Sequence, residues 1–148
     1  MNITFNTEGI TMPDINQQRI TQWVADVAAC YGKCVGEINY IFVDDERILE
    51  VNRQFLQHDY YTDIITFDYS QGRYISGDLY ISLDTVRSNA EEQSFYPLSP
   101  TYFQKELYRV IIHGILHLCG INDKGPGERE IMEEAEDKAL KLWETDNK

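Results

Sequence analysis

The segment from His113 to Asp123 constrains the fold of this chain more than any other stretch. His113 and His117 stand four residues apart, so on a helix both imidazoles lie on one face and can reach one ion. Gly120 follows the apolar run, where helices commonly end in a left-handed residue, and the chain can then turn back. Asp123 brings a carboxylate toward the same ion. The sequence predicts a helix, a tight exit loop and a metal site that spans both.

The expected ligands are His113, His117 and Asp123, and three protein ligands leave a fourth tetrahedral position open for water, as in catalytic zinc sites. A lone histidine on an apolar helix is usually a packed core residue, but two of the chain's three histidines share this face. The spacing is similar to that of the H-E-x-x-H zinc helix, in which the glutamate is the general base of a metalloprotease. Gly114 stands at that position, which argues against peptide hydrolysis.

Three segments carry a resemblance to a known family. Residues 113–120, H-G-I-L-H-L-C-G, resemble the signature H-G-x-L-H-L-x-G-Y-D-H of the bacterial rRNA maturation endoribonucleases, the YbeY family. Residues 51–67 and the G-D-L-Y-I-S strand at 77–82 resemble two upstream segments of that family, so the likeness spans about residues 45–135. The resemblance implies an α+β fold and a metal-dependent, single-strand-specific endoribonuclease that acts in rRNA maturation and ribosome quality control.

The chain departs from the family at two positions. The third histidine ligand of the family falls at Asp123. Aspartate oxygen binds zinc at about 2.0–2.2 Å, but its charge makes the ion acidify water less, and its hardness favours manganese or iron more. We expect the site to bind one divalent ion, with zinc preferred over manganese and iron. Leu56 stands where the family carries an arginine at the substrate phosphate, and Arg53, one helical turn earlier, is the candidate replacement.

The expected chemistry follows from the metal, whose bound water would attack a phosphodiester while the ion stabilises charge on the phosphoryl oxygens. No residue is an obvious general base. Asp63, Asp78 and Glu106 are candidates for the shell around the metal ligands. Strand-end capping or ordinary ion pairing is the alternative for these three carboxylates.

The net charge of −12 and the pI near 4.5 oppose binding to a polyanion, because nucleic-acid affinity is largely phosphate neutralisation. Candidate RNA contacts are Arg53, His58, Arg73 and Lys124, against the simpler interpretation that each is a solvated surface charge. We therefore expect weak binding to single-stranded RNA, an rRNA precursor. Ribosomal proteins or a ribosome-associated GTPase are the expected partners that supply placement.

Acidic residues are concentrated near the C-terminus, where they are expected to form the solvated face of a final helix, away from substrate. They are Glu128, Glu130, Glu133, Glu134, Glu136 and Asp137. The apolar stripe of that helix is predicted from Ile131, Ala135, Leu140 and Trp143.

The remaining pattern predicts strands at residues 2–6, 38–43, 63–69 and 78–83, with helices between and after them. The last two strands are expected to form a hairpin-like pair, because Gly72 and Gly77 lie in their connection. Residues 38–43 are almost wholly apolar and should be buried on both faces. Asp14 is expected to cap the first helix. The apolar stripe of that helix is Ile20, Trp23, Val24, Val27 and Ala28. We predict a single α+β domain over residues 1–148, one small mixed β-sheet covered by about five helices.

The chain opens without the basic start and apolar core of a secretory signal, and it has no apolar run of membrane-spanning length. Its three cysteines predict reduced thiols and a cytoplasmic location, with Cys30 and Cys34 free and buried rather than paired. The residues alone favour a metal hydrolase, and the resemblance supplies RNA as substrate. Two alternatives stay open: a metallohydrolase of another substrate, such as a peptide, and a non-catalytic, metal-stabilised ribosome-assembly factor.

Overall fold

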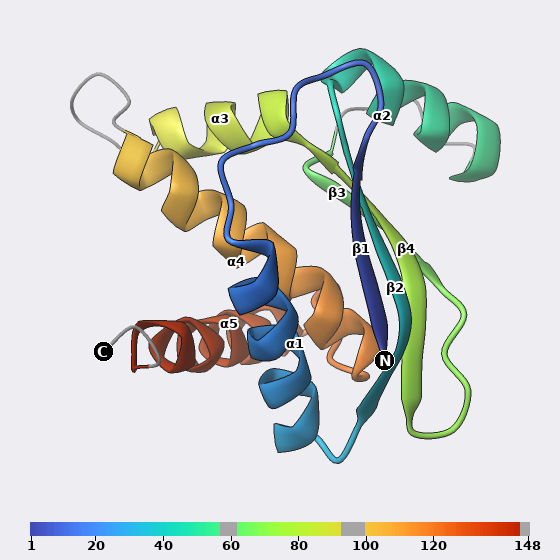
Figure 1. Ribbon diagram of the computed structural model, residues 1–148, viewed down its shortest axis with the longest axis vertical. Helices are drawn as coiled ribbons and strands as arrows, with labels where there is room; N and C mark the ends of the chain where they lie inside the picture. The colour runs from blue at the N-terminus through green and yellow to red at the C-terminus, as the bar shows by residue number, and fades with distance from the viewer. Residues whose placement is uncertain (57–61, 93–99, 146–148) are drawn as a thin grey trace.

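The computed structural model describes residues 1–56, 62–92 and 100–145, which form one four-stranded sheet, five α-helices and one π-helix (Figure 1). In chain order the elements are β1 Asn2–Thr7, α1 Gln17–Cys30, β2 Cys34–Val43, α2 Asp45–Val51, the π-helix η1 Asn52–Leu56, β3 Ile64–Asp68, β4 Tyr74–Ser82, α3 Leu83–Glu92, α4 Pro100–Leu118 and α5 Glu128–Thr145. The predicted α+β class is confirmed. None of the helices in the described residues has the length and apolar character needed to cross a membrane.

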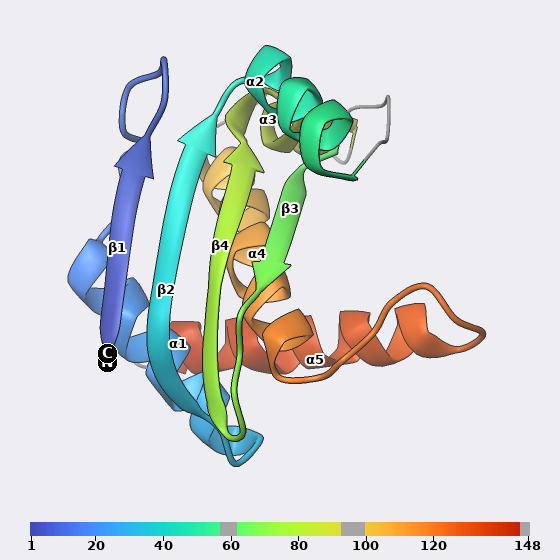
Figure 2. The same ribbon diagram turned by 90° about the vertical axis from the view of Figure 1, so that its right-hand side faces the viewer.

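The sheet is mixed, with the strand order β1-β2-β4-β3. β1 and β4 both lie parallel to β2, and β3 lies antiparallel to β4 at one edge (Figure 2). The predicted hairpin-like pairing of the third and fourth strands is therefore confirmed. Burial on both faces of residues 38–43 was expected, but fully buried Ile38 and Tyr40 alternate with half-buried Asn39 and Ile41. That expectation is wrong for the first part of the strand, because α2 covers only one end of the second face (Figure 1).

One face of the sheet is covered by α1 and α4, with α5 packed behind them (Figure 2). Two polar groups of the core fix these layers. The Tyr40 hydroxyl donates to the Ile111 carbonyl of α4 at 3.0 Å, and the Trp23 Nε1–H donates to the Ala139 carbonyl of α5 at 2.8 Å. The Tyr40 hydroxyl and the Trp23 N–H are thus both satisfied at contacts between two elements. These hydrogen bonds fix how the layers fit together.

The first helix carries the predicted apolar stripe, since all five of its predicted residues are buried. Its predicted cap is wrong. The helix starts at Gln17 because the Asn16 side chain accepts a hydrogen bond from the Arg19 N–H at 3.0 Å. Asparagine and aspartate are comparable N-caps, and the structure uses the one nearer the apolar stripe rather than Asp14.

Gly114 lets α4 lie unusually close to the sheet. A Cβ atom at this position would stand 2.2 Å from Leu79 Cδ2 and 2.9 Å from Ile64 Cδ1, both on the strands beneath the helix. A side chain here therefore cannot fit unless the Leu79 and Ile64 side chains shift within the packed interface. The close approach holds the C-terminal half of α4 against the edge of the sheet that ends in β3.

Candidate metal centre

The predicted exit from α4 is confirmed. α4 ends at Leu118, and Gly120 has a φ of 103°, in the left-handed region that favours glycine. The Gly120 N–H donates to the His117 carbonyl and the Ile121 N–H to the Leu116 carbonyl, both at 3.0 Å. This pair of bonds is the Schellman arrangement, which satisfies the last carbonyls of the helix and reverses the chain.

The reversal returns Asp123 to the histidines of α4. Asp123 Oδ2 lies 3.3 Å from His113 Nε2, and Asp123 Oδ1 lies 3.5 Å from His117 Nε2. One ligand atom from each of the three residues falls within 4.8 Å of the others. The structure therefore brings together the three predicted ligands, two from one helix face and one from the loop.

The three residues fit a divalent ion. Bonds of about 2.0–2.1 Å at tetrahedral angles place neighbouring ligand atoms about 3.3–3.4 Å apart, which matches the two Nε2–oxygen distances. Asp123 Oδ1 is also buried without a hydrogen-bond partner among the described residues. A buried carboxylate oxygen without a donor is costly, and a cation would satisfy it. The donor set suits zinc, and it also suits harder metals through the carboxylate.

Glu136 of α5 completes the site, and sequence reasoning missed it. The His113 Nδ1–H donates to Glu136 Oε2 at 2.6 Å, and Arg109 Nη1 donates to Glu136 Oε1 at 2.7 Å. Glu136 was expected on a solvated face, but only 6% of it is exposed. The prediction is wrong because the buried stripe of α5 contains Met132, Ala135 and Ala139 with Glu136, whereas Ile131 is 58% exposed. Positions 132, 135, 136 and 139 form a helical stripe that could have revealed it.

The two histidines have opposite electrostatic environments. Burial lowers the pKa of His113, but the hydrogen bond and charge of Glu136 outweigh it, so the pKa is raised. Burial and the charge of His113 lower the pKa of His117, although Asp123 acts against them. The carboxylates thus surround His113 more closely than His117.

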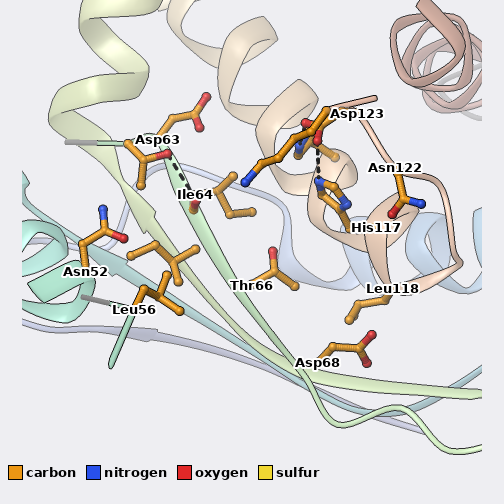
Figure 3. Close-up of a pocket in the computed structure, with 14 residues that line it drawn as sticks. Asn52, Leu56, Asp63, Ile64, Thr66, Asp68, His117, Leu118, Asn122 and Asp123 are labelled. Carbon is orange, nitrogen blue, oxygen red and sulfur yellow. Dashed lines mark hydrogen bonds and ion pairs between the residues drawn. The ribbon is translucent and has the colours of Figure 1, made fainter. Parts of the chain in front are cut away.

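A cavity of about 490 Å³ opens beside the candidate ligands, between α4 and the free edge of β3 (Figure 3). Its lining comprises Asn52, Leu56, Thr62, Asp63, Ile64, Ile65, Thr66, Asp68, His113, His117, Leu118, Asn122, Asp123 and Lys124. Figure 3 shows His117 and Asp123 on one wall and Asn52 and Leu56 across from them. The cavity therefore gives a substrate access to the candidate ligands.

A second cavity of about 350 Å³ lies on the other side of His113 and contains two of the predicted carboxylates. Asp63, His113 and Asp123 line both cavities, and Glu106, which is 8% exposed, lines the second. Burial raises the pKa of Asp63 despite the opposing effects of the His113 charge and of backbone N–H donors. Asp78 is placed elsewhere: it lines neither cavity and accepts from Asn39 Nδ2 at 3.0 Å across the sheet.

The predicted RNA contacts are not gathered in one place. Lys124 is exposed and lines the large cavity. Arg53 and Arg73 are exposed but line neither cavity, and Arg73 lies in the turn before β4. His58 lies outside the described residues. Leu56 does line the large cavity, so the position that carries arginine in the resembling family faces the candidate ligands here.

The cysteines are free, as predicted. Cys34 and Cys119 are partly buried, and burial raises the pKa of the Cys119 thiol to about 11. Cys30 is exposed, so the expectation that it is buried is wrong. It is the last residue of α1, where the helix meets the surface.

Comparisons with known proteins find relatives over nearly the whole chain. The family model described as endoribonuclease YbeY matches residues 2–144. The chain is 69% identical over 140 residues to the endoribonuclease YbeY of Phocaeicola vulgatus, covering 95% of this chain and 97% of that protein. It is 66% identical over 142 residues to the endoribonuclease YbeY of Bacteroides thetaiotaomicron, covering 96% and 99%. The solution structure of TM1509 from Thermotoga maritima is similar with a TM-score of 0.61 and 26% identity, over 97% of this chain and 93% of that one.

Proposed function

This chain belongs to the endoribonuclease YbeY family, and we propose that it is a metal-dependent endoribonuclease that cleaves single-stranded RNA during rRNA maturation and ribosome quality control. The observation that carries the proposal is the convergence of His113, His117 and Asp123 at an open cavity. Three protein ligands in a cleft are the arrangement of a catalytic rather than a structural metal site.

The ligands define the catalytic part of the proposal. His113, His117 and Asp123 hold one divalent ion, zinc before manganese or iron. When bound, the ion would act as a Lewis acid that lowers the pKa of water and neutralises charge on a phosphoryl oxygen. Gly120 sets the position of Asp123 by reversing the chain, and Gly114 sets the position of the histidines by letting α4 approach the sheet.

The cavity walls provide the substrate part of the proposal. Lys124 is the only lysine or arginine among the described residues that line the large cavity, so it is the expected phosphate contact. Arg53, Arg73 and His58 are proposed to act further along the RNA or not at all. Asp63 and Glu106 border His113 and are proposed to orient it or a substrate group, whereas Asp78 would act only through the sheet.

A partner is part of the proposed activity. The net charge of −12 predicts weak affinity for RNA alone, and Lys124 is the one lysine that lines the large cavity within the described part of the chain. We propose that a ribosomal protein or a ribosome-associated GTPase places the enzyme on its rRNA precursor. A reducing cytoplasm is the proposed location, in keeping with the three free cysteines.

The two alternative functions are less well supported. Peptide hydrolysis of the H-E-x-x-H type needs a glutamate where Gly114 stands, and this position faces Leu79 and Ile64 of the sheet rather than the ligands. A purely structural metal needs a closed shell, but only three candidate ligands meet among the described residues.

The proposal is tested by cleavage of a labelled single-stranded RNA and of its matched duplex. Wild type and His117→Ala are purified identically, their metal content is measured, and each is assayed with and without chelator. We expect cleavage of the single strand only, lost with chelator and restored by zinc or manganese. In His117→Ala we expect a loss of about 10³-fold, because metal catalysis supplies several kcal/mol and each 1.36 kcal/mol is tenfold. Metal-loaded wild type that never cleaves RNA, even with ribosomal subunits added, would refute an endoribonuclease.

A further inference from the structure

Behind His113 lies an ion pair between the buried Glu136 and the half-buried Arg109. Glu136 offers one oxygen to each neighbour, Oε2 to His113 Nδ1 at 2.6 Å and Oε1 to Arg109 Nη1 at 2.7 Å. Arg109 also donates through Nη2 to Asp137 at 2.9 Å, so its guanidinium bridges two adjacent carboxylates of α5. The result is a continuous chain of contacts from Asp137 through Arg109 and Glu136 to His113.

This chain of contacts determines which nitrogen of His113 faces the candidate ion. A carboxylate only accepts, so the contact of Glu136 with Nδ1 requires the hydrogen to be on Nδ1. The lone pair of a neutral ring is then on Nε2, and Nε2 is the atom that faces Asp123. Free imidazole would exchange between two tautomers and rotate about its side-chain bonds, and the Glu136 contact removes both freedoms.

Glu136 is not available for a catalytic role in the large cavity. Both of its oxygens are engaged and 6% of the residue is exposed, so it cannot also act as a general base on a substrate in the large cavity. It does not line that cavity. His117 has no corresponding carboxylate behind it among the described residues. The two histidine ligands are therefore supported unequally.

We propose that Glu136, held in place by Arg109, is a positioning residue that fixes the tautomer and orientation of His113 for metal binding. The inference rests on the proposed metal-dependent function and adds a residue from α5 to a site otherwise built from α4 and its exit loop. Partners of this kind typically contribute 10–100-fold to metal affinity. A residue that merely joins α5 to α4 would leave metal affinity unchanged once the protein is folded.

The test compares Glu136→Gln, Glu136→Ala and a matched control, Glu134→Gln. Glu134 lies on the same helix and pairs with exposed Lys138 at 3.4 Å, and its substitution by Gln removes the same charge. Zinc affinity is measured by competition with a chelator, and the ¹⁵N shifts of His113 are measured in the metal-free protein. We expect about 10–100-fold weaker zinc binding in Glu136→Ala, a smaller loss in Glu136→Gln, and wild-type affinity in the control.

The ¹⁵N spectra make the outcome decisive. In the wild type and the control, His113 should be the Nδ1–H tautomer, and in Glu136→Ala a mixture. Should Glu136→Ala not fold, Glu136→Gln carries the test, because its amide keeps the shape but offers one acceptor oxygen to the two donors of His113 and Arg109. Unchanged affinity and unchanged tautomer in a folded Glu136 variant would overturn the inference. Failure of the wild type to bind zinc would instead refute the metal-dependent function, and the tautomer would still report on Glu136.

Discussion

The two walls of the large cavity are built in different ways. On the α4 wall, His113 and His117 project from a helix packed on the sheet, with a buried carboxylate behind His113. The opposite wall is formed by η1 and the edge strand β3, where Asn52 and Ile65 are buried but Leu56 is 39% exposed. The candidate metal ligands thus depend on a helix packed on the sheet, whereas the substrate wall also depends on an exposed side chain of η1. The comparison teaches that the first is fixed by packing and the second by the identity of a few side chains.

The largest effect is expected from Asp123, the proposed ligand at the position where the resembling family carries histidine. Asp123→Asn keeps the shape but removes the charge, and we expect metal affinity to fall by more than the roughly 10–100-fold that loss of an outer partner causes. Asp123→His restores the three-histidine set and should retain binding, with the preference shifted toward zinc. Isothermal titration with zinc and manganese measures both. Equal affinity in Asp123→Asn and wild type would remove Asp123 from the ligand set.

The next effect tests the packing of the same wall. Gly114→Ala places a methyl group 2.2 Å from Leu79 Cδ2, and such overpacking costs about 1–3 kcal/mol. The thermal midpoint of the metal-free protein should fall by several degrees. Gly125→Ala is the matched control, because its added methyl group meets only the flexible end of Glu128. Equal thermal midpoints for the two variants would show that the histidines are not positioned by the close packing of α4.

The difference between the walls also explains what could be predicted from sequence. His113, His117, Gly120 and Asp123 are determined by spacing along one helix and its exit, which is local information. The sheet and helices follow from apolar periodicity in the same way. Glu136 was missed because its role depends on which face of α5 meets α4. The buried face contains Met132 and Glu136, whereas the predicted apolar stripe began one residue earlier, at Ile131.

Arg53, in η1 beside the opposite wall, also shows that sequence spacing alone does not predict which way a side chain faces. Its predicted position beside Leu56 assumed an α-helix, in which residues three apart share a face. Residues 52–56 instead form a π-helix, with wider i to i+5 bonding, and here Asn52 and Leu56 face the cavity while Arg53 does not. A local change of helix type is not visible in the apolar pattern. The candidate replacement for the missing arginine therefore cannot be read from the sequence.

Leu56→Arg would give the substrate wall the residue that the family pattern carries there. A guanidinium across from the ligands can make a charge-assisted bond to phosphate, so kcat/KM for single-stranded RNA should rise about tenfold, equivalent to about 1.4 kcal/mol. Phe55→Arg adds the same charge one residue earlier, outside the described lining of the cavity, and should change little. Equal gains in both variants would indicate general charge rather than a phosphate site.

Lys124 links the two walls, since it follows ligand Asp123 and lines the cavity. Lys124→Gln should weaken binding of all RNA sequences severalfold and reduce the slope of log affinity against log salt by about 1, without loss of metal. Filter binding across salt concentrations measures this. Lys141→Gln, an exposed position of α5 that lines neither cavity, is the control. An unchanged slope in Lys124→Gln would place the phosphates elsewhere.

The smallest effect is a pH dependence at Asp63, the residue that starts the substrate wall and borders both cavities. Burial raises its pKa in the folded protein above the ordinary value of about 3.9. The folded state therefore holds the proton more tightly than the unfolded chain, and stability is lost as pH rises through the interval between these two values. Asp63→Asn keeps an acceptor for the Ile64 N–H and removes the buried charge. The metal-free variant should melt higher than wild type at pH 7, and the difference should vanish below about pH 3. A variant that melts lower at pH 7 would show that the carboxylate stabilises this wall, and the contrast with the packed α4 wall would then be weaker than the structure indicates.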